Sequence, residues 1–530
     1  MQRENEPHVS HPGDEAQWQG TPPKSKTLRV QILAAGVGLA AIAAVGLAIG
    51  FSAAQDSKVT GEGLPVVQGE RAEDDGLTAE DDAVNDDEAQ ANEPQNEAGI
   101  GAARLADVIP VPSREAGIDL TALDGGSVRR DLRPSYNECQ DWVGRRFLMT
   151  VYSVPTEHDD TRTVAELAQE GFTHVGPWYM EDRWTSGAAA AQNGLCTVFP
   201  VGLSIEPEEA MADLPRAVEA IRSDMQRVLD DSSLNATVSA WSMLPEEMNV
   251  YRNGHEELLI ELANTIKAND PLGRPVYMYL QSNADPHQFE VNAVHTEILG
   301  QGNYLSTNGL ADQRVHLKSS ILRSIKAREV TGQDQDTVMP VVEHRIHSGT
   351  LADGQSQHIE TWVRHDLMTT FALGTDGFIA FSGFPPKQGI DDFARYNDAY
   401  TQVMAEIEAT SLAEFYYRGI HRPEITGKVV SGPATLSMEV LYNADPGEEV
   451  ETHNTVSVRG WGIGPILEVV VVNHANEAVT VEIDGIQSSL KWYNALTGAE
   501  IESDGNTATL ELGPYGTAIL QGISSEGEID

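Results

Sequence analysis

Between about residues 143 and 410, apolar runs of strand length alternate with amphipathic segments of helix length. The runs are rich in β-branched and aromatic residues, which favour strands. Strands that alternate with helices are typical of folds built on a parallel sheet. The predicted strands are FLMTVYSV (147–154), FTHVGPWY (172–179), LCTVFPVGL (195–203), ATVSAWSML (236–244), PVYMYLQS (275–282), EILGQGNYLS (297–306), TVMPVVEHRI (337–346) and DGFIAFSGF (376–384).

The segments between these runs show helical periodicity. Residues 214–231, 255–270 and 391–409 each place apolar side chains three or four positions apart, which puts them on one face of a helix. In residues 255–270 that face consists of Leu258, Leu259, Leu262, Ala263 and Ile266.

Eight strand–helix units in roughly 270 residues match a (β/α)8 TIM barrel, which typically needs about 250 residues. The competing fold is a doubly wound open sheet, which usually carries a glycine-rich turn after its first strand. The sequence TVYSVPTEHDD (150–160) has no such turn. We therefore expect an α/β chain with a TIM barrel over residues 106–422.

The pattern changes near the C-terminus. Short β-rich runs such as PILEVVVVN (465–473) and AVTVEID (478–484) are separated by turns rich in Asn, Asp and Gly. This pattern predicts an antiparallel β-sandwich over residues 423–530.

The N-terminal hundred residues predict export. An uncharged stretch from Val30 to Gln55 is long enough to cross a bilayer, which takes roughly 20 apolar residues. Basic residues precede it, so residues 1–29 should be a cytoplasmic tail and residues 30–54 a transmembrane anchor. Cleavage as a signal segment, followed by secretion, is the alternative. Residues 55–105 are acidic and predict a disordered linker.

Charge and composition limit the kinds of ligand that the chain is expected to bind. The formal net charge of −46 argues against nucleic acid, whose binding proteins need basic surface. Cys139 and Cys196 could form a disulfide or remain free thiols. His174, His344 and His347 show no HExxH or Cys/His zinc spacing, so we expect no metal site and no cofactor.

In a βα barrel the active site lies at the carboxyl ends of the strands. The fourth predicted strand is followed by Glu246 and Glu247, and the seventh contains Glu343 near its end. Aromatic and polar residues at the strand ends could hold a sugar, because aromatic faces stack on sugar rings while hydroxyl groups take polar partners. The predicted binding residues are His174, Trp178, Tyr179, Trp241, Tyr279, Asn283, Tyr304 and His344.

Acids after the fourth and seventh strands resemble the arrangement in retaining glycoside hydrolases with (β/α)8 barrels, often called clan A. The resemblance covers about residues 143–410. It implies a general acid/base after the fourth strand and a nucleophile, Glu343, after the seventh. That clan usually has Asn directly before its acid/base, where this chain has Glu246. Either Glu247 or Glu246 could therefore be the acid/base, and we favour Glu247.

The resemblance thus implies an exported glycoside hydrolase that cleaves a poly- or oligosaccharide with two carboxylates. The alternative is a catalytically inactive barrel that binds carbohydrate on the cell envelope. Each acid also has a purely structural interpretation. Glu246 and Glu247 could be first-turn residues of a helix, and Glu343 could pair with Arg345.

Overall fold

The computed structural model describes residues 139–141, 147–152, 163–178, 183–306, 309–332, 337–338, 340–343, 351, 354–382, 392–440, 450–464 and 466–524. All of the described residues belong to the unit Gly99–Asp530. The predicted segments 1–29, 30–54 and 55–105 lie outside the described residues. Within the described residues, no helix combines the length and the apolar character that a bilayer crossing requires.

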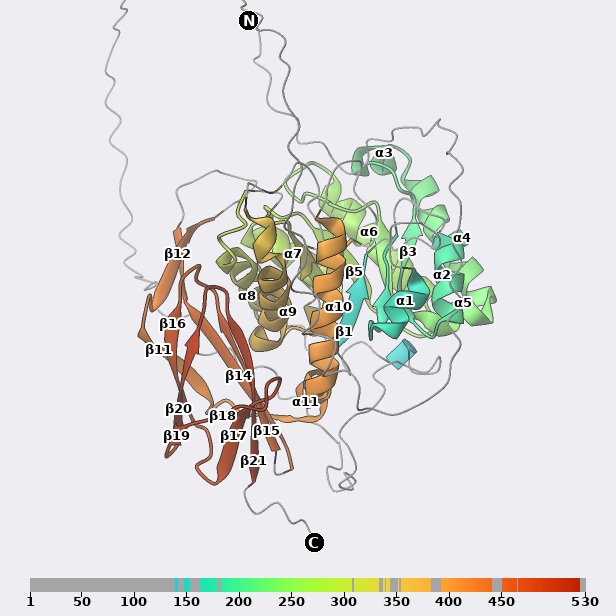
Figure 1. The fold of residues 1–530 in the computed structure, drawn as a ribbon. Coiled ribbons are helices and arrows are strands. Elements are labelled where there is room, and N and C mark those ends of the chain that lie inside the picture. Colours follow the sequence, from blue (N-terminus) through green and yellow to red (C-terminus); the bar gives the residue numbers. More distant parts are fainter. Residues whose placement is uncertain are drawn as a thin grey trace, which may run out of the picture. The chain divides into compact units, whose positions relative to one another are not determined.

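A closed barrel of parallel strands forms the first part of this unit (Figure 1). Strands β1 to β6 pair in sequence order, β6 pairs with β8, β8 pairs with β9, and β9 pairs with β1 to close the ring. Two short strands, β7 and β8, share the seventh position. The strands are β1 (Leu148–Val151), β2 (His174–Val175), β3 (Cys196–Gly202), β4 (Val238–Leu244), β5 (Val276–Leu280), β6 (Ile298–Asn303), β7 (Thr337–Val338), β8 (Val341–Glu343) and β9 (Gly377–Phe381). All eight predicted strand positions are confirmed.

Helices cover the outside of the barrel. In α6, the five apolar residues of the predicted face are all buried. In α4, the Asp213 side chain caps the first turn by accepting a hydrogen bond from the backbone of Arg216, and Pro215 lies in that turn. The helices are α1 (Val164–Gln169), α2 (Arg183–Gln192), α3 (Pro207–Ala212), α4 (Leu214–Asp230), α5 (Ser232–Thr237), α6 (His255–Asn269), α7 (Pro286–His295), α8 (Val315–Thr331), α9 (Ile359–Leu373), α10 (Phe393–Thr410) and α11 (Leu412–Arg418), with short 3-10 turns at Cys139–Asp141 and Ser356–His358.

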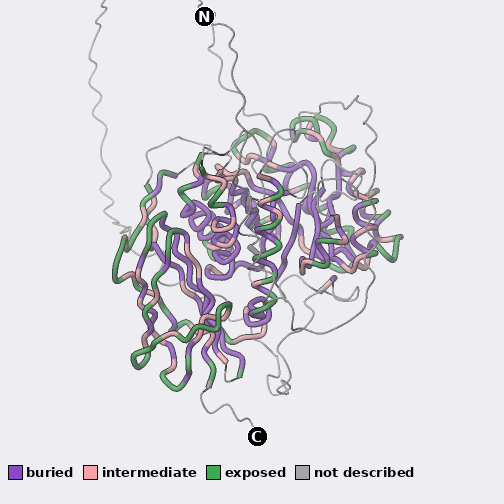
Figure 2. The backbone as a smooth tube through the Cα atoms, in the orientation of Figure 1, coloured by how far each residue is buried: buried purple, intermediate pink, exposed green. Residues whose placement is uncertain are grey.

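Two buried layers follow from the alternation of side chains along each strand. In β5, Tyr277 and Tyr279 belong to the cluster inside the barrel, whereas Val276 and Met278 join the layer between strands and helices. Figure 2 shows the strands as buried and the outer parts of the helices as exposed. The interior cluster is Leu148, Tyr152, Val198, Ala240, Tyr277, Tyr279, Ile298, Val341, Ile379 and Phe381.

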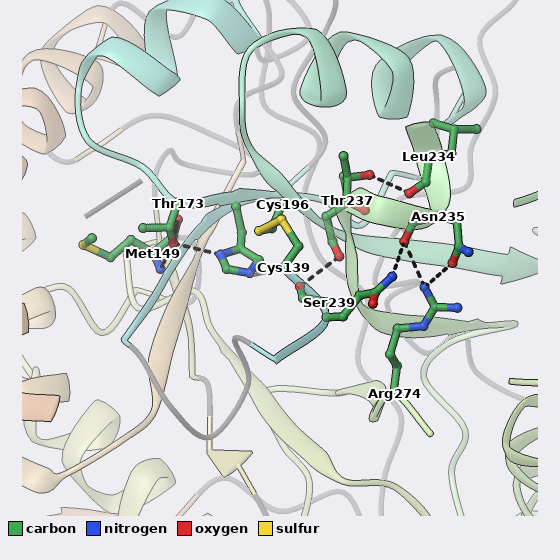
Figure 3. Close-up of a disulfide and its surroundings, with 12 residues drawn as sticks. Cys139, Met149, Thr173, Cys196, Leu234, Asn235, Thr237, Ser239 and Arg274 are labelled. Atoms are coloured by element: carbon green, nitrogen blue, oxygen red, sulfur yellow. Dashed lines mark hydrogen bonds between the residues drawn. A yellow bond between two sulfur atoms is a disulfide. The ribbon is translucent and has the colours of Figure 1, made fainter. Parts of the chain in front are cut away.

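A disulfide joins Cys139 to Cys196, the first residue of β3, which settles the open question about these cysteines (Figure 3). Both residues are buried. On the same side of the barrel, the Arg274 guanidinium donates to the backbone and side-chain oxygens of Asn235, at 3.2 and 2.9 Å. The disulfide therefore fastens the start of the described chain to the amino end of β3.

The C-terminal part consists of antiparallel sheets. The larger has the strand order β10-β14-β15-β21-β17-β18, and the second has the order β11-β16-β20-β19. A two-stranded sheet, β12–β13, completes the sandwich that the sequence predicts. The strands are β10 (Ile420–His421), β11 (Thr426–Ser431), β12 (Thr435–Glu439), β13 (Val450–Asn454), β14 (Val456–Ile463), β15 (Ile466–Asn473), β16 (Val479–Asp484), β17 (Leu490–Asn494), β18 (Glu500–Ile501), β19 (Ser503–Asp504), β20 (Thr507–Leu512) and β21 (Thr517–Ser524). Strands β14 and β15 contact α9 of the barrel.

Candidate active site

Two carboxylates follow β4 at the carboxyl end of the barrel, and they have different surroundings. Glu246 is buried, with 8% of its surface exposed. The Tyr152 hydroxyl, directly after β1, donates a 2.8 Å hydrogen bond to its Oε1. Its Oε2 is also buried and has no hydrogen-bond partner among the described residues. Glu246 is therefore enclosed by the barrel and held by a phenol from across its mouth.

Burial controls the protonation of this part of the site. It raises the pKa of the Glu246 carboxyl well above its usual value, and the negative charge of Glu247 adds to the rise. The hydrogen bond from Tyr152 lowers the pKa of Glu246, but by less than burial raises it. Burial and the nearby Glu246 also raise the pKa values of the Tyr152 and Tyr277 phenols. The site thus favours a protonated carboxyl on Glu246 and neutral phenols on Tyr152 and Tyr277.

Glu247 is half-buried and more accessible than its neighbour. The Gln281 amide, just after β5, donates a 3.2 Å hydrogen bond to its Oε2. The backbone φ of Glu247 is 56°, in the left-handed region. This conformation costs a residue with a Cβ atom about 1–2 kcal/mol, and such strain is concentrated at functional sites. The surrounding structure therefore holds Glu247 in a conformation that it would not adopt by itself.

The segment after Glu247 is well anchored. Met248 is buried in the layer between strands and helices. The Asn249 backbone N–H donates to Nδ1 of His255 at 3.1 Å. The Tyr251 hydroxyl donates to Oδ2 of Asp285, the cap of α7, at 2.5 Å. These contacts with α6 and α7 fix the direction in which Glu247 leaves β4.

Aromatic side chains line the barrel next to the two acids. The rings of Tyr279 and Tyr304 lie 6.5 Å apart and nearly parallel, and the Phe381 ring lies 4.9 Å from that of Tyr304. Gly302 in β6 makes room for both tyrosines, because a Cβ atom there would lie 2.2 Å from the Tyr279 hydroxyl oxygen. Asn283 follows β5 and is half-buried. Tyr279 therefore lies in β5, near its carboxyl end, while Asn283 and Tyr304 follow the carboxyl ends of β5 and β6, as the sequence predicts.

Trp241 is not at the mouth. It is completely buried in the layer between strands and helices, because its neighbour Ala240 takes the interior position of β4. Its indole N–H donates to Oδ2 of Asp270 at 3.0 Å, and the Arg274 guanidinium lies 4.5 Å from its ring centre. An indole enclosed in this way has no face left for a sugar, so we assign Trp241 to packing.

His174 and Trp178 are also enclosed. His174 is the first residue of β2 and pairs with Thr150 of β1 and with Cys196, the first residue of β3. Its Nδ1 is hydrogen-bonded to the Thr173 hydroxyl, and burial lowers the pKa of the imidazole to about 3. Trp178 is buried with its edge towards Phe199, at a ring distance of 6.3 Å. Neither side chain offers a surface to a ligand at the mouth.

Glu343 is the last residue of β8, where its backbone pairs with Phe381 of β9. This places it at the carboxyl end of the seventh barrel position, as predicted from the sequence. The placement of its side chain lies outside the described part of the structure, as do Tyr179 and His344.

Four residues of this site are absent from the binding set predicted from the sequence. Tyr152, Tyr277, Gln281 and Gly302 all contact or support the acids and aromatic rings described above. Tyr152 was detectable, because Leu148, Thr150 and Tyr152 alternate towards one face of the first strand. Among the residues that the structure describes, no cluster of three or more potential ligands could hold a metal ion.

Comparisons with known proteins find similarity in structure but none in sequence. No protein-family model matches the chain, and no curated protein sequence matches it. Among similar solved structures, an α-amylase from Geobacillus thermoleovorans in complex with acarbose has 8% identity and a TM-score of 0.43, covering 74% of this chain and 100% of that one. A GH27 β-L-arabinopyranosidase from Geobacillus stearothermophilus has 11% identity and a TM-score of 0.46, covering 74% and 99%. The barrel itself is established by the strand pairing described above.

Proposed function

We propose that the chain is an exported glycoside hydrolase that cleaves a poly- or oligosaccharide with retention of configuration. One observation carries the proposal. In a closed parallel barrel, a strained, accessible carboxylate follows β4, and a second glutamate ends β8. Both lie at the end of the barrel where such folds place their active sites. Two carboxyl groups in that arrangement suit glycosidic bond cleavage.

Glu247 is the proposed acid/base and Glu343 the proposed nucleophile. In the first step Glu343 attacks the anomeric carbon while Glu247 donates its proton to the leaving glycosidic oxygen. In the second step Glu247 accepts a proton from water, and the resulting hydroxide displaces Glu343 from the sugar. Glu247 is favoured over Glu246 because it is the more accessible of the two, which proton transfer to a substrate requires.

The aromatic rings next to the acids support a sugar as the substrate. Tyr279 and Phe381 are buried in the barrel interior, and the half-buried Tyr304 packs against both, so Tyr304 is the ring of this group that is open to a ligand. Aromatic carbon faces and a few fixed polar groups are what a sugar-binding pocket needs.

Export is supported by the disulfide and by the N-terminal sequence. A disulfide between Cys139 and Cys196 suits an oxidising compartment. The uncharged stretch of residues 30–54, with basic residues before it, suits a single-pass anchor with the barrel outside the cytoplasm. Secretion after cleavage is the alternative outcome.

The test is hydrolysis of a panel of plant, algal and microbial glycans by the full chain. We expect the native protein to release sugar, and Glu247→Gln and Glu343→Gln each to lose about 10²–10⁴-fold of the rate. Glu261→Gln, at an exposed position of α6, is the matched control and should keep full activity. Proton NMR should show that the first product released has the same anomeric configuration as the substrate. Full activity in Glu343→Gln would refute the mechanism.

The second candidate function is a barrel that binds carbohydrate without cleaving it. It is favoured by Glu246, which stands where the retaining hydrolases of clan A usually have Asn. Binding of a glycan by the native protein, with no release of sugar over days, would support this function over hydrolysis.

A further inference from the structure

The two acids after β4 differ in burial and in the group that donates a hydrogen bond to them. Glu246 is buried, whereas Glu247 is half-buried. Glu246 accepts from a phenol that is itself fully buried, whereas Glu247 accepts from an amide. None of the described basic side chains forms an ion pair with Glu246. A carboxylate in that position would be a buried charge without a described counter-ion.

A buried charge without a partner is costly, and a carboxyl group avoids the cost by keeping its proton. The groups near Glu246 support this result. Tyr152 and Tyr277 are neutral phenols inside the barrel, and among the described residues Glu247 is the carboxylate whose negative charge acts on Glu246. Tyr152 donates to Oε1, which leaves Oε2 as the oxygen that carries the proton.

We propose that Glu246 is a positioning residue that keeps its proton throughout the reaction, held by Tyr152, so that Glu247 alone alternates between acid and base. This inference rests on the proposed function. An acid/base must be protonated in the first step and ionised in the second. A permanent negative charge on the adjacent residue would oppose that ionisation, whereas a neutral carboxyl does not.

Replacement by an amide is the direct test, because glutamine has the size and neutrality of a protonated glutamate and can accept from Tyr152. We expect Glu246→Gln to keep the pH profile of the native chain and to lose less of kcat than Glu247→Gln, which loses about 10²–10⁴-fold. Glu246→Ala removes the bond to Tyr152 and should lower kcat more than Glu246→Gln does. The proposal is wrong if Glu246→Gln is as inactive as Glu247→Gln.

A second measurement does not depend on finding the substrate. The full chain is labelled with ¹³C at the glutamate side-chain carboxyl carbon, and the Glu246 signal is identified by its loss in Glu246→Gln. We expect the chemical shift of a protonated carboxyl at pH 7, and in Tyr152→Phe a further rise in the titration midpoint, because a hydrogen bond that favours ionisation is lost. A shift typical of a carboxylate at pH 7 overturns the proposal.

The two measurements separate this proposal from the function on which it rests. If the native chain hydrolyses no glycan while Glu246 is protonated, the hydrolase proposal fails and the protonation state stands. If the chain hydrolyses a glycan but Glu246 is ionised, only the role of Glu246 fails.

Discussion

Glu247 combines a candidate chemical role with a backbone conformation that its side chain disfavours. Its φ of 56° would suit glycine, which has no Cβ atom to clash in the left-handed region. Stability is commonly traded for function at such positions.

We therefore predict that Glu247→Gly is more stable than Glu247→Ala by about 1 kcal/mol. Both variants lose the carboxylate, so both should lose hydrolysis. The matched pair is Glu261→Gly and Glu261→Ala at an exposed position of α6, where the order should reverse because glycine costs a helix about 1 kcal/mol relative to alanine. Urea unfolding of the four variants measures the differences, and the same order at both positions would contradict the assignment of strain.

The residue scale also shows what the sequence can reveal about a barrel site. The pair Glu246–Glu247 could be located because it directly follows a strand that is obvious from its composition. Trp241 was assigned to the binding site because the sequence does not say which face of β4 points inward. That choice depends on register, and a shift of one residue exchanges the two faces. The different burial of Glu246 and Glu247 was also not predictable, since it depends on Tyr152 from the far end of the barrel sequence.

At the scale of elements, Gly302 in β6 sets how closely two aromatic side chains approach the strand. A Cβ atom at this position would lie 2.2 Å from the Tyr279 hydroxyl oxygen and 2.9 Å from Cε2 of Tyr304. The Tyr279 ring is buried, so it cannot move away without losing other contacts, whereas Tyr304 is half-buried.

We predict that Gly302→Ala displaces Tyr279 and Tyr304, lowers the free energy of unfolding by about 1–3 kcal/mol and weakens glycan binding by about tenfold, or roughly 1.4 kcal/mol. Gly513→Ala in the sandwich is the control, because a Cβ atom there would meet nothing within 4 Å. Isothermal titration with the preferred glycan and thermal unfolding measure the two effects. Equal affinity in Gly302→Ala and the native chain would remove the two tyrosines from the site.

The disulfide between Cys139 and Cys196 acts at the same scale, because it links a short 3-10 turn to β3 across 57 positions of sequence. Closing a loop of that length stabilises a chain by about 4 kcal/mol in the chain-entropy model. We predict that reduction lowers the free energy of unfolding by about 2–4 kcal/mol. Urea titrations with and without reductant measure this change. A Cys139→Ala/Cys196→Ala variant should not respond to the reductant.

At the scale of the whole described unit, the sandwich contacts the barrel through buried polar groups. The Lys318 ammonium of α8 donates to the backbone oxygens of Asn454 and Val456, at 2.8 and 3.3 Å. Nε2 of His365 in α9 lies 3.0 Å from Nδ1 of His474, whose other nitrogen lies 2.8 Å from the Ser457 hydroxyl. The contact between the two parts is therefore a hydrogen-bonded network as well as an apolar surface.

The sequence predicted the barrel and the sandwich but not this contact. Hydrophobic periodicity identifies a helix face that is buried by apolar residues. Lysine usually points to solvent and histidine is intermediate in burial, so the burial of Lys318 in α8 and of His365 in α9 leaves no signal in the pattern. Only the position of the sandwich against these helices explains why they are buried.

The histidine pair makes the stability of this contact depend on pH. Burial lowers the pKa of His474 and of His365 below their usual values, although Asp366 beside His365 acts in the opposite direction. Lys318, whose pKa burial lowers to about 7, further opposes a positive charge on either ring. In the unfolded chain both rings gain a proton near pH 6.5. Their contribution is therefore complete above about pH 6.5 and is lost as the pH falls through the lower values of the folded state.

We predict that the free energy of unfolding falls as the pH is lowered from 7 to 5, by up to about 1.4 kcal/mol per pH unit for each histidine. His474→Gln keeps a donor and an acceptor between His365 and Ser457 but cannot take up a proton. It should therefore reduce the slope by up to about 1.4 kcal/mol per pH unit, the contribution of one proton. Ser457→Ala should lower stability at every pH and keep the slope, because both rings remain. Urea unfolding at several pH values measures the slopes. If the slope is unchanged in His474→Gln, His474 takes up its proton at the same pH in the folded and the unfolded chain. That result would contradict the prediction that burial at the barrel–sandwich contact lowers the pKa of His474.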